Sequence, residues 1–142
     1  MPSTSIPEVK AALVEALKNS VALNGITVTK GKEPTRVSEF VWLPKAKAKR
    51  DFNLIGGTAP LDEVVTATLW VVVIKGTSGP EESEARAFEI AEAVETVLRS
   101  PVEAAEQELS PPKVEEIEQV QVPLDKKWAC HIEMTVTVTA RI

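Results

Sequence analysis

Residues 61–75 read LDEVVTATLWVVVIK, and the other predicted elements are arranged around this segment. Every second residue from Val65 to Val73 is apolar, which predicts a strand with one face turned to a core. The opposite face begins with threonines and ends with Trp70, Val72 and Ile74, so its second half is predicted to be covered as well. The second cover is either a helix of the chain itself or a neighbouring subunit.

A helix is predicted to follow this strand, over residues 81–99, after a turn at 76–80. Acidic side chains in its first turns and Arg99 in its last turn suit the helix dipole. Pro101 ends the pattern. Its apolar residues recur at helical spacing and predict one buried stripe.

The clearest strand in the sequence is Trp128–Ile142, in which apolar and polar residues alternate throughout. Cys130, Ile132 and Met134 are among the residues on its dry face, and His131 lies on the wet face. At about 3.3 Å per residue such a strand spans roughly 45–50 Å. This length predicts that the strand bends or extends beyond the domain.

The remaining elements are shorter. Ser5 is expected to cap a first helix, with Glu8 returning the hydrogen bond. Strands are predicted at 26–30 and 37–43, the second ending at Pro44 or lying at a sheet edge. A weaker strand is predicted at 114–122, with a bulge or a late start because its apolar residues change parity.

Residues 45–60 form a long basic connection that is predicted to be a mobile arm or loop, or a hairpin arm. Alternate lysines on an extended chain lie on one face, where they could contact a phosphate backbone. The alternative is a solvated loop or an edge strand protected by lysines. Phe52 is the one nearby candidate for base stacking. The residues of this segment that are candidates for a contact are Lys45, Lys47, Lys49, Arg50 and Phe52.

These elements predict a single α+β domain over residues 1–142. We expect a largely antiparallel sheet of four or five strands with two helices packed on it. The three tryptophans all fall in predicted strands, where core packing is the default and a subunit interface comes second. The candidate subunit-interface residues are Trp70, Val72 and Ile74.

Charge is divided unequally along the chain, whose net charge is −5. Residues 1–50 hold nine Lys/Arg and four Asp/Glu, a net charge of +5, whereas the rest of the chain carries −10. A molecule with one basic and one acidic surface is suited to head-to-tail self-association. The alternative is a chance distribution dominated by an acidic helix.

One cysteine, no apolar run of membrane-spanning length and no signal-peptide pattern lead us to expect a cytoplasm-like setting. His131 is the only histidine, and a cross-strand neighbour is favoured over a catalytic or ligand role for it. The glycine-containing turns lack the spacing of a nucleophile elbow or a phosphate loop. We therefore expect no enzymatic activity, no metal and no cofactor.

Several segments together resemble the tail terminator (tail completion) proteins of long-tailed bacteriophages. The resemblance covers roughly residues 6–142 and depends on element order and a helix signature. The segments that carry it are Leu13-Val14-Glu15-Ala16-Leu17, Gly25-Ile26-Thr27-Val28, Glu39-Phe40-Val41-Trp42-Leu43, Glu63–Ile74, Glu84-Ala85-Arg86-Ala87-Phe88, Ala93–Leu98 and Trp128–Ile142.

The resemblance implies a structural virion protein at the head-proximal end of the tail, assembled in the host cytoplasm. Such proteins form a ring, usually of six subunits, that stops tail-tube polymerisation and joins the head connector, while DNA passes through the lumen. The implied partners are other copies of the chain, the tube protein, the connector and, transiently, DNA. The resemblance makes the basic arm, with Lys45, Lys47, Lys49, Arg50 and Phe52, a candidate for lumen or intersubunit contacts. Two rival classes stay open: another neck or tail protein, such as a connector or tube subunit, and a small cellular α+β binding domain.

Overall fold

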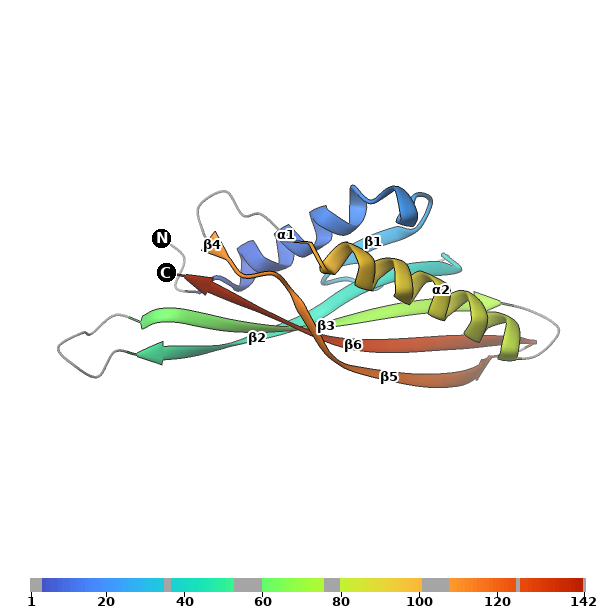
Figure 1. The fold of residues 1–142 in the computed structure, drawn as a ribbon. Helices are drawn as coiled ribbons and strands as arrows, with labels where there is room; N and C mark the ends of the chain where they lie inside the picture. The colour runs from blue at the N-terminus through green and yellow to red at the C-terminus, as the bar shows by residue number, and fades with distance from the viewer. Residues whose placement is uncertain are drawn as a thin grey trace.

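The strand expected from residues 61–75 lies in the middle of a mixed sheet in the computed structural model of the chain (Figure 1). The structure describes residues 4–34, 37–52, 60–75, 80–100, 108–124 and 126–141. The strands are β1 (Thr27–Lys30), β2 (Glu39–Phe52), β3 (Pro60–Lys75), β4 (Glu108–Leu109), β5 (Lys113–Leu124) and β6 (Lys127–Arg141). The helices are α1 (Ile6–Lys18) and α2 (Pro80–Leu98), and a 3-10 turn spans Val21–Leu23.

The strand order is β1-β2-β3-β6, with both β4 and β5 on the far side of β6. β5 pairs with β6 between Lys127 and Thr137, and β4 pairs with Ala140 and Arg141, so the two strands follow one another along the same edge. β1 is parallel to β2, and the other pairings are antiparallel. The predicted α+β class and the largely antiparallel sheet are confirmed.

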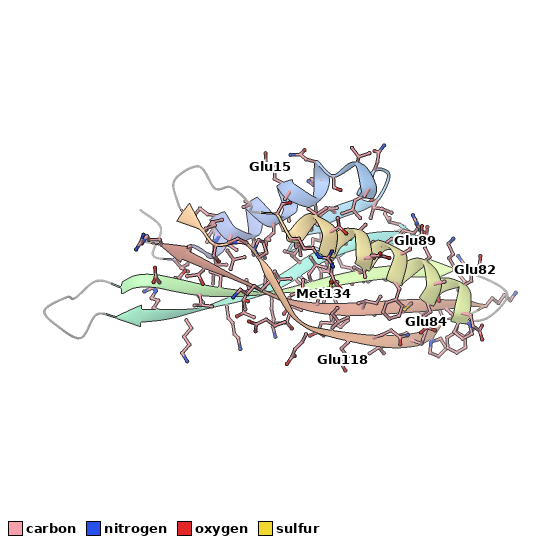
Figure 2. The ribbon with its side chains drawn as sticks, viewed as in Figure 1. Glu15, Glu82, Glu84, Glu89, Glu118 and Met134 are labelled. Carbon is pink, nitrogen blue, oxygen red and sulfur yellow. The ribbon has the colours of Figure 1, made fainter. Side chains whose placement is uncertain are left out.

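Both helices lie on the same face of the sheet, so the domain has two layers (Figure 1). α1 lies over β1 and β2, and α2 lies over β3 and β6. The predicted dry faces of β3 and β6 point to the helices, and Figure 2 shows the side chains between the layers, with Met134 labelled. Each fully buried valine, leucine or methionine there contributes about 1.5–3 kcal/mol.

The core residues on β3 and β6 have exposed fractions of 0–1%. They are Val65, Ala67, Leu69, Val71, Val73, Cys130, Ile132, Met134, Val136, Val138 and Ala140. The helices contribute Val9, Leu13, Leu17, Ala87, Ile90, Val94 and Leu98 to the same cluster.

Of the two alternatives predicted for Pro44, a strand end is wrong, because β2 continues through this residue to Phe52. The other, a sheet edge, is confirmed, because within the described residues β1 pairs with β2 only as far as Leu43. The pairing of β2 with β3 shifts register between Trp42 and Lys45. A register shift leaves a residue without a ladder hydrogen bond, and proline has no N–H to donate. Residues 45–52 and 60 therefore belong to a β2–β3 hairpin, while residues 53–59 lie outside the described part of the chain.

The predicted side-chain cap at Ser5 is also wrong. Ser5 does occupy the N-cap position of α1, but its hydroxyl makes no capping hydrogen bond. The hydroxyl donates instead to the carboxylate of Glu63 on β3. The bulge predicted in the strand at 114–122 is confirmed, since the β5–β6 register shifts between Val114 and Glu116.

Candidate interaction surfaces

The face of the sheet away from the helices, here called the open face, is apolar at one end. Phe40 pairs with Val72 across β2 and β3, and Trp42 pairs with Trp70 in the same way. Phe40 and Val72 are each 2% exposed, although they lie outside the main core cluster. Trp70 and Ile74 are half-buried. The apolar end of the open face therefore gathers aromatic residues of β2 and β3 in adjacent cross-strand pairs.

His131 on β6 completes this cluster. Its ring meets that of Trp70 edge to face, with a centroid distance of 5.9 Å and an interplanar angle of 78°. Burial lowers the pKa of His131, and the nearby charge of Glu33 opposes that effect only in part. A neutral imidazole against an indole is a packing contact. The expected cross-strand role of His131 is confirmed.

The three predicted lysines lie together on the other end of the open face. Lys45, Lys47 and Lys49 are exposed and pair with Thr68, Thr66 and Val64 of β3. The next row, on β6, holds Thr135, Thr137 and Thr139. The alternation of Lys with Ala thus places cations beside two rows that are mainly hydroxyl groups, while Ala46 and Ala48 face the helices and pack against the core.

Arg50 is separated from these lysines because it lies at the opposite parity of β2. Its Nε is 2.8 Å from Oε2 of Glu63, and the Arg50 side chain is 36% exposed whereas the Glu63 side chain is fully buried. Phe52 pairs with Pro60 along the backbone at the last pair of the hairpin, and its side chain lies outside what the structure describes. The structure therefore divides the predicted basic set between the two faces.

Glu63 is the buried anchor of the N-terminal segment. Its Oε1 accepts hydrogen bonds from Thr4 Oγ1 at 2.6 Å, from the Ser5 backbone N–H at 2.7 Å and from Ser5 Oγ. Burial raises the pKa of Glu63, but the hydrogen bonds from Ser5, Thr4 and Arg50 outweigh it and bring the pKa to about 2. The carboxylate is therefore charged and holds the start of α1 against β3.

Sequence reasoning missed Glu63, although a signal was present. Glu63 has the same parity as the apolar row from Val65 to Val73, so an acidic residue was already placed on the core side of the strand. A carboxylate on a core face needs donors, and these come from residues 58 and 59 positions away in the chain. The acidic row of β5, described below, was likewise missed.

The two edges of the sheet carry opposite charge. β1 pairs only with residues 40–43 of β2, so within the described part of the chain Lys45–Phe52 has a strand neighbour on one side only. β5 forms the other edge, and β6 is the one strand with which it pairs among the described residues. Glu116 and Glu118 on β5 are exposed and pair with Thr135 and Glu133 of the open face. Figure 2 shows Glu118 on the side of the sheet away from the helices.

Cys130 is a core residue, as predicted. Its thiol is fully buried, and desolvation raises its pKa, a shift that a hydrogen bond from Gln119 opposes. Thiols of this kind are unreactive because the thiolate is the nucleophile. Within the described residues, no group of three or more His, Cys, Asp or Glu side chains could hold a metal ion.

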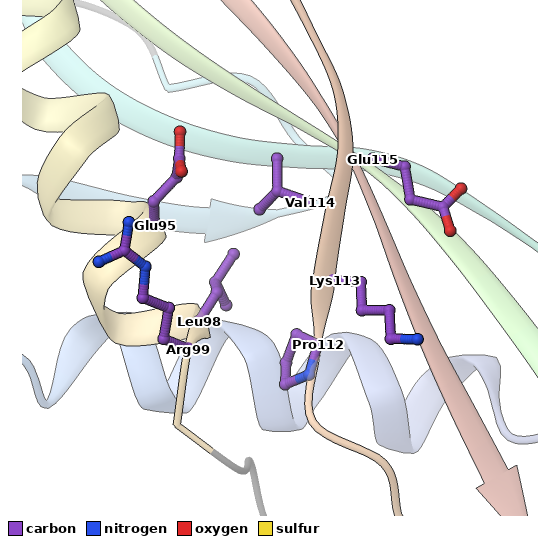
Figure 3. Close-up of a pocket in the computed structure, with 7 residues that line it drawn as sticks. All are labelled: Glu95, Leu98, Arg99, Pro112, Lys113, Val114 and Glu115. Carbon is purple, nitrogen blue, oxygen red and sulfur yellow. The ribbon is translucent and has the colours of Figure 1, made fainter.

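A shallow pocket of about 430 Å³ lies between the end of α2 and the start of β5 (Figure 3). Leu98 and Val114 point into it from the two elements, while Lys113 and Glu115 project to the other side of β5 (Figure 3). Its charged rim, which includes Glu95 and Arg99, presents no arrangement of nucleophile and base. Neither described helix is both long and apolar enough to cross a membrane.

Comparison with known proteins gives a match of fold. No family model matches the chain, and no curated protein matches it in sequence. Among solved structures, a chain from the "Virion of native gene transfer agent (GTA) particle" superposes with a TM-score of 0.69 at 14% sequence identity. The match covers 99% of this chain and 100% of that chain. The two chains therefore share an α+β fold over their whole lengths.

Proposed function

We propose that this chain is a structural protein of a phage-like virion, and that it serves as a tail terminator. The observation that carries the proposal is the fold shared end to end with a chain from a virion particle. Because the match covers 99% of this chain and 100% of the other, it favours the same kind of structural subunit in both. The resemblance of the sequence to tail terminator proteins supports the more specific role.

In this role the chain forms a ring, expected to have six subunits, on the finished tail tube. The ring ends tube polymerisation, joins the head connector and lets DNA pass through its lumen. The protein then acts by self-association and docking, without catalysis or a cofactor. Its place is the head-proximal end of the tail in the virion.

The apolar end of the open face supports a contact in the assembly. Both helices cover the other face, so the side chains of Trp70 and Ile74 remain half-buried in the subunit. Val72 is already 2% exposed, and a charge there would disturb the subunit as well as any interface. We therefore expect Ile74→Lys to weaken assembly more than it lowers thermal stability. Intact assembly of both Val72→Lys and Ile74→Lys would identify this patch as internal packing alone.

The deciding measurement is the mass in solution by light scattering over a concentration series, with negative-stain images of the largest species. Closed rings of about six subunits are the expected result. Long cylinders would identify a tube subunit instead. If the chain stays monomeric, purified tail tubes are added, and failure to cap them would contradict the terminator role.

A further inference from the structure

Among the residues that the structure describes, one stretch of strand on each side of the sheet has no further strand neighbour. The outer half of β2, from Lys45 onwards, pairs with β3 but not with β1, whose pairing ends at Leu43. On the other side, β5 has β6 as its strand neighbour within the described part of the chain, and eleven of its twelve residues pair with it. Open strand edges carry unpaired backbone N–H and C=O groups and are templates for pairing with another chain.

The side chains of the two edges are complementary on both faces. On β2 the lysines 45, 47 and 49 lie on the open face, and the alanines between them face the helices. On β5, Glu116 and Glu118 lie on the open face, and Ile117 between them lies on the helix side. Ile117 is 48% exposed, although its cross-strand partner Met134 is fully buried. A Lys-Ala-Lys-Ala-Lys edge thus matches a Glu-Ile-Glu edge, with charge on one face and apolar groups on the other.

The strand directions also agree. β2 is antiparallel to β3, β3 to β6 and β6 to β5, so β5 runs opposite to β2 within the sheet. A second copy in the same orientation would bring its β2 to this β5 as an antiparallel neighbour, with both open faces on the same side. Opposite charges on directly paired residues stabilise such a ladder.

We propose that the β5 edge of one copy pairs with the outer half of β2 of the next copy. Glu116 and Glu118 lie beside the lysine row of the neighbour, and Ile117 lies beside Ala46 and Ala48. This contact deepens the proposed function and depends on it, because it is the subunit contact of the ring. The contact is head to tail, since it uses a different surface on each partner, and such contacts generate rings when the rotation closes.

β1 pairs with residues 40–43 of β2, so a second copy can pair only with the outer half of that strand, and this sets the offset between copies. Lys45 shares a row with Thr68 of β3 and Thr135 of β6, whereas β5 extends from Thr137 back to Lys127 of β6. The outer half of β2 and most of β5 therefore lie at opposite ends of the sheet. Successive copies must be displaced along the strand direction, which tilts the strands as in closed sheets.

Charge reversal tests the contact directly. The acid-edge variant carries Glu116→Lys and Glu118→Lys, and the basic-edge variant carries Lys45→Glu, Lys47→Glu and Lys49→Glu. Each variant alone should need a roughly tenfold or higher concentration to assemble, measured by light scattering. An equimolar mixture should regain assembly, because the reversed edge of each variant then faces an edge of opposite charge. One chain carrying all five substitutions should also assemble.

The matched control reverses two exposed acids on the helices, Glu15 and Glu92, with Glu15→Lys and Glu92→Lys. It makes the same change in net charge as the acid-edge variant and should assemble as the wild type does. Thermal unfolding checks that each variant is folded. If a reversed edge prevents folding, a double variant with Ala48→Cys and Ile117→Cys is used instead. A short bismaleimide should then link the subunits of its rings into covalent multimers.

The outcomes separate this inference from the proposed function. If both edge variants still form rings at the wild-type concentration, the β5–β2 contact is overturned and the ring itself is not. Rings of the cysteine-pair variant that give no covalent multimers would lead to the same conclusion. A mixture that assembles no better than its components would do the same. A wild-type chain that forms no ring, alone or on tail tubes, would overturn both.

Discussion

Replacement of Glu63 by glutamine should destabilise the fold through loss of one buried charge. The carboxylate is fully buried, and its pKa is about 2 in the folded chain against an ordinary value of 4.5. At about 1.4 kcal/mol per pKa unit, this difference corresponds to roughly 3 kcal/mol of stability at neutral pH. Glutamine has the same size and keeps one acceptor oxygen. Its NH2 group, which can only donate, would face the donor of either Arg50 or Ser5.

The pH dependence has a definite sign. Because folding lowers the pKa of Glu63, its contribution is fully present above about pH 4.5 and is lost as the pH falls toward 2. The wild type and Glu63→Gln should therefore differ by about 3 kcal/mol at pH 7 and approach each other in acid. Denaturant unfolding followed by circular dichroism at a series of pH values measures this difference.

Glu92→Gln is the control, since Glu92 is an exposed acid on α2 and should change stability by less than about 0.5 kcal/mol. Equal stabilities of the wild type and Glu63→Gln at pH 7 would refute the reasoning. So would a difference that stays constant between pH 4.5 and 2.5, because the buried charge would then not be its source.

Further substitutions and probes test other parts of the fold. Leu69→Ala should lower the unfolding free energy by about 2–5 kcal/mol. Val21→Ala, at an 89% exposed position, should change it by less than about 0.5 kcal/mol. Similar losses in the two variants would contradict a core at Leu69. Cys130 should react with a thiol reagent only as fast as the chain unfolds, and rapid labelling of the folded protein would contradict its burial. Gly31→Ala should cost about 1 kcal/mol in chemical denaturation, because Gly31 has φ +86° with open space around its missing side chain; an unchanged midpoint would argue against that backbone conformation. In hydrogen exchange on the unassembled chain, alternate amides from Lys45 onwards should exchange rapidly, and uniform strong protection would contradict an open β2 edge.

The two central strands could be predicted from sequence because their environment is regular. β3 and β6 lie side by side, and helices cover one face of each along most of its length. An apolar residue is therefore needed at every second position, and the resulting period of two is a local signal. The order of elements and the α+β class follow from these strands and from the two amphipathic helices.

The extent of β2 could not be predicted in the same way. Proline ends most strands because it cannot donate to the ladder, and here the shift in register beside Pro44 removes that conflict. The basic residues beyond it left a loop, a hairpin arm and an edge strand open as alternatives, since alternating lysine and alanine has no apolar face that would select a strand. Their open-face neighbours are hydroxyl groups of β3 and β6, which only the assembled sheet brings beside them.

The anchor at Glu63 shows a second limit. Its donors lie at Thr4, at Ser5 and at Arg50, and the first two are 58 or 59 residues away in the chain. Local rules assign Ser5 to a helix cap, a contact worth about 1 kcal/mol. The buried carboxylate offers the same hydroxyl a charge-assisted hydrogen bond, which is roughly twice as strong as a neutral one. The tertiary contact therefore prevails over the local one.

The open face is where the sequence pattern and the isolated subunit disagree. Alternation in β3 breaks down at Trp70, yet the described chain places both helices on the other face. The conflict is smaller than the pattern alone suggests, because Phe40 and Val72 on this face are only 2% exposed. Trp70 and Ile74 are only half-buried, so part of their apolar surface is not covered within the subunit. Natural chains break local rules mainly at functional sites. A partner surface should therefore be sought first at this end of the open face and at the charged edges of the sheet.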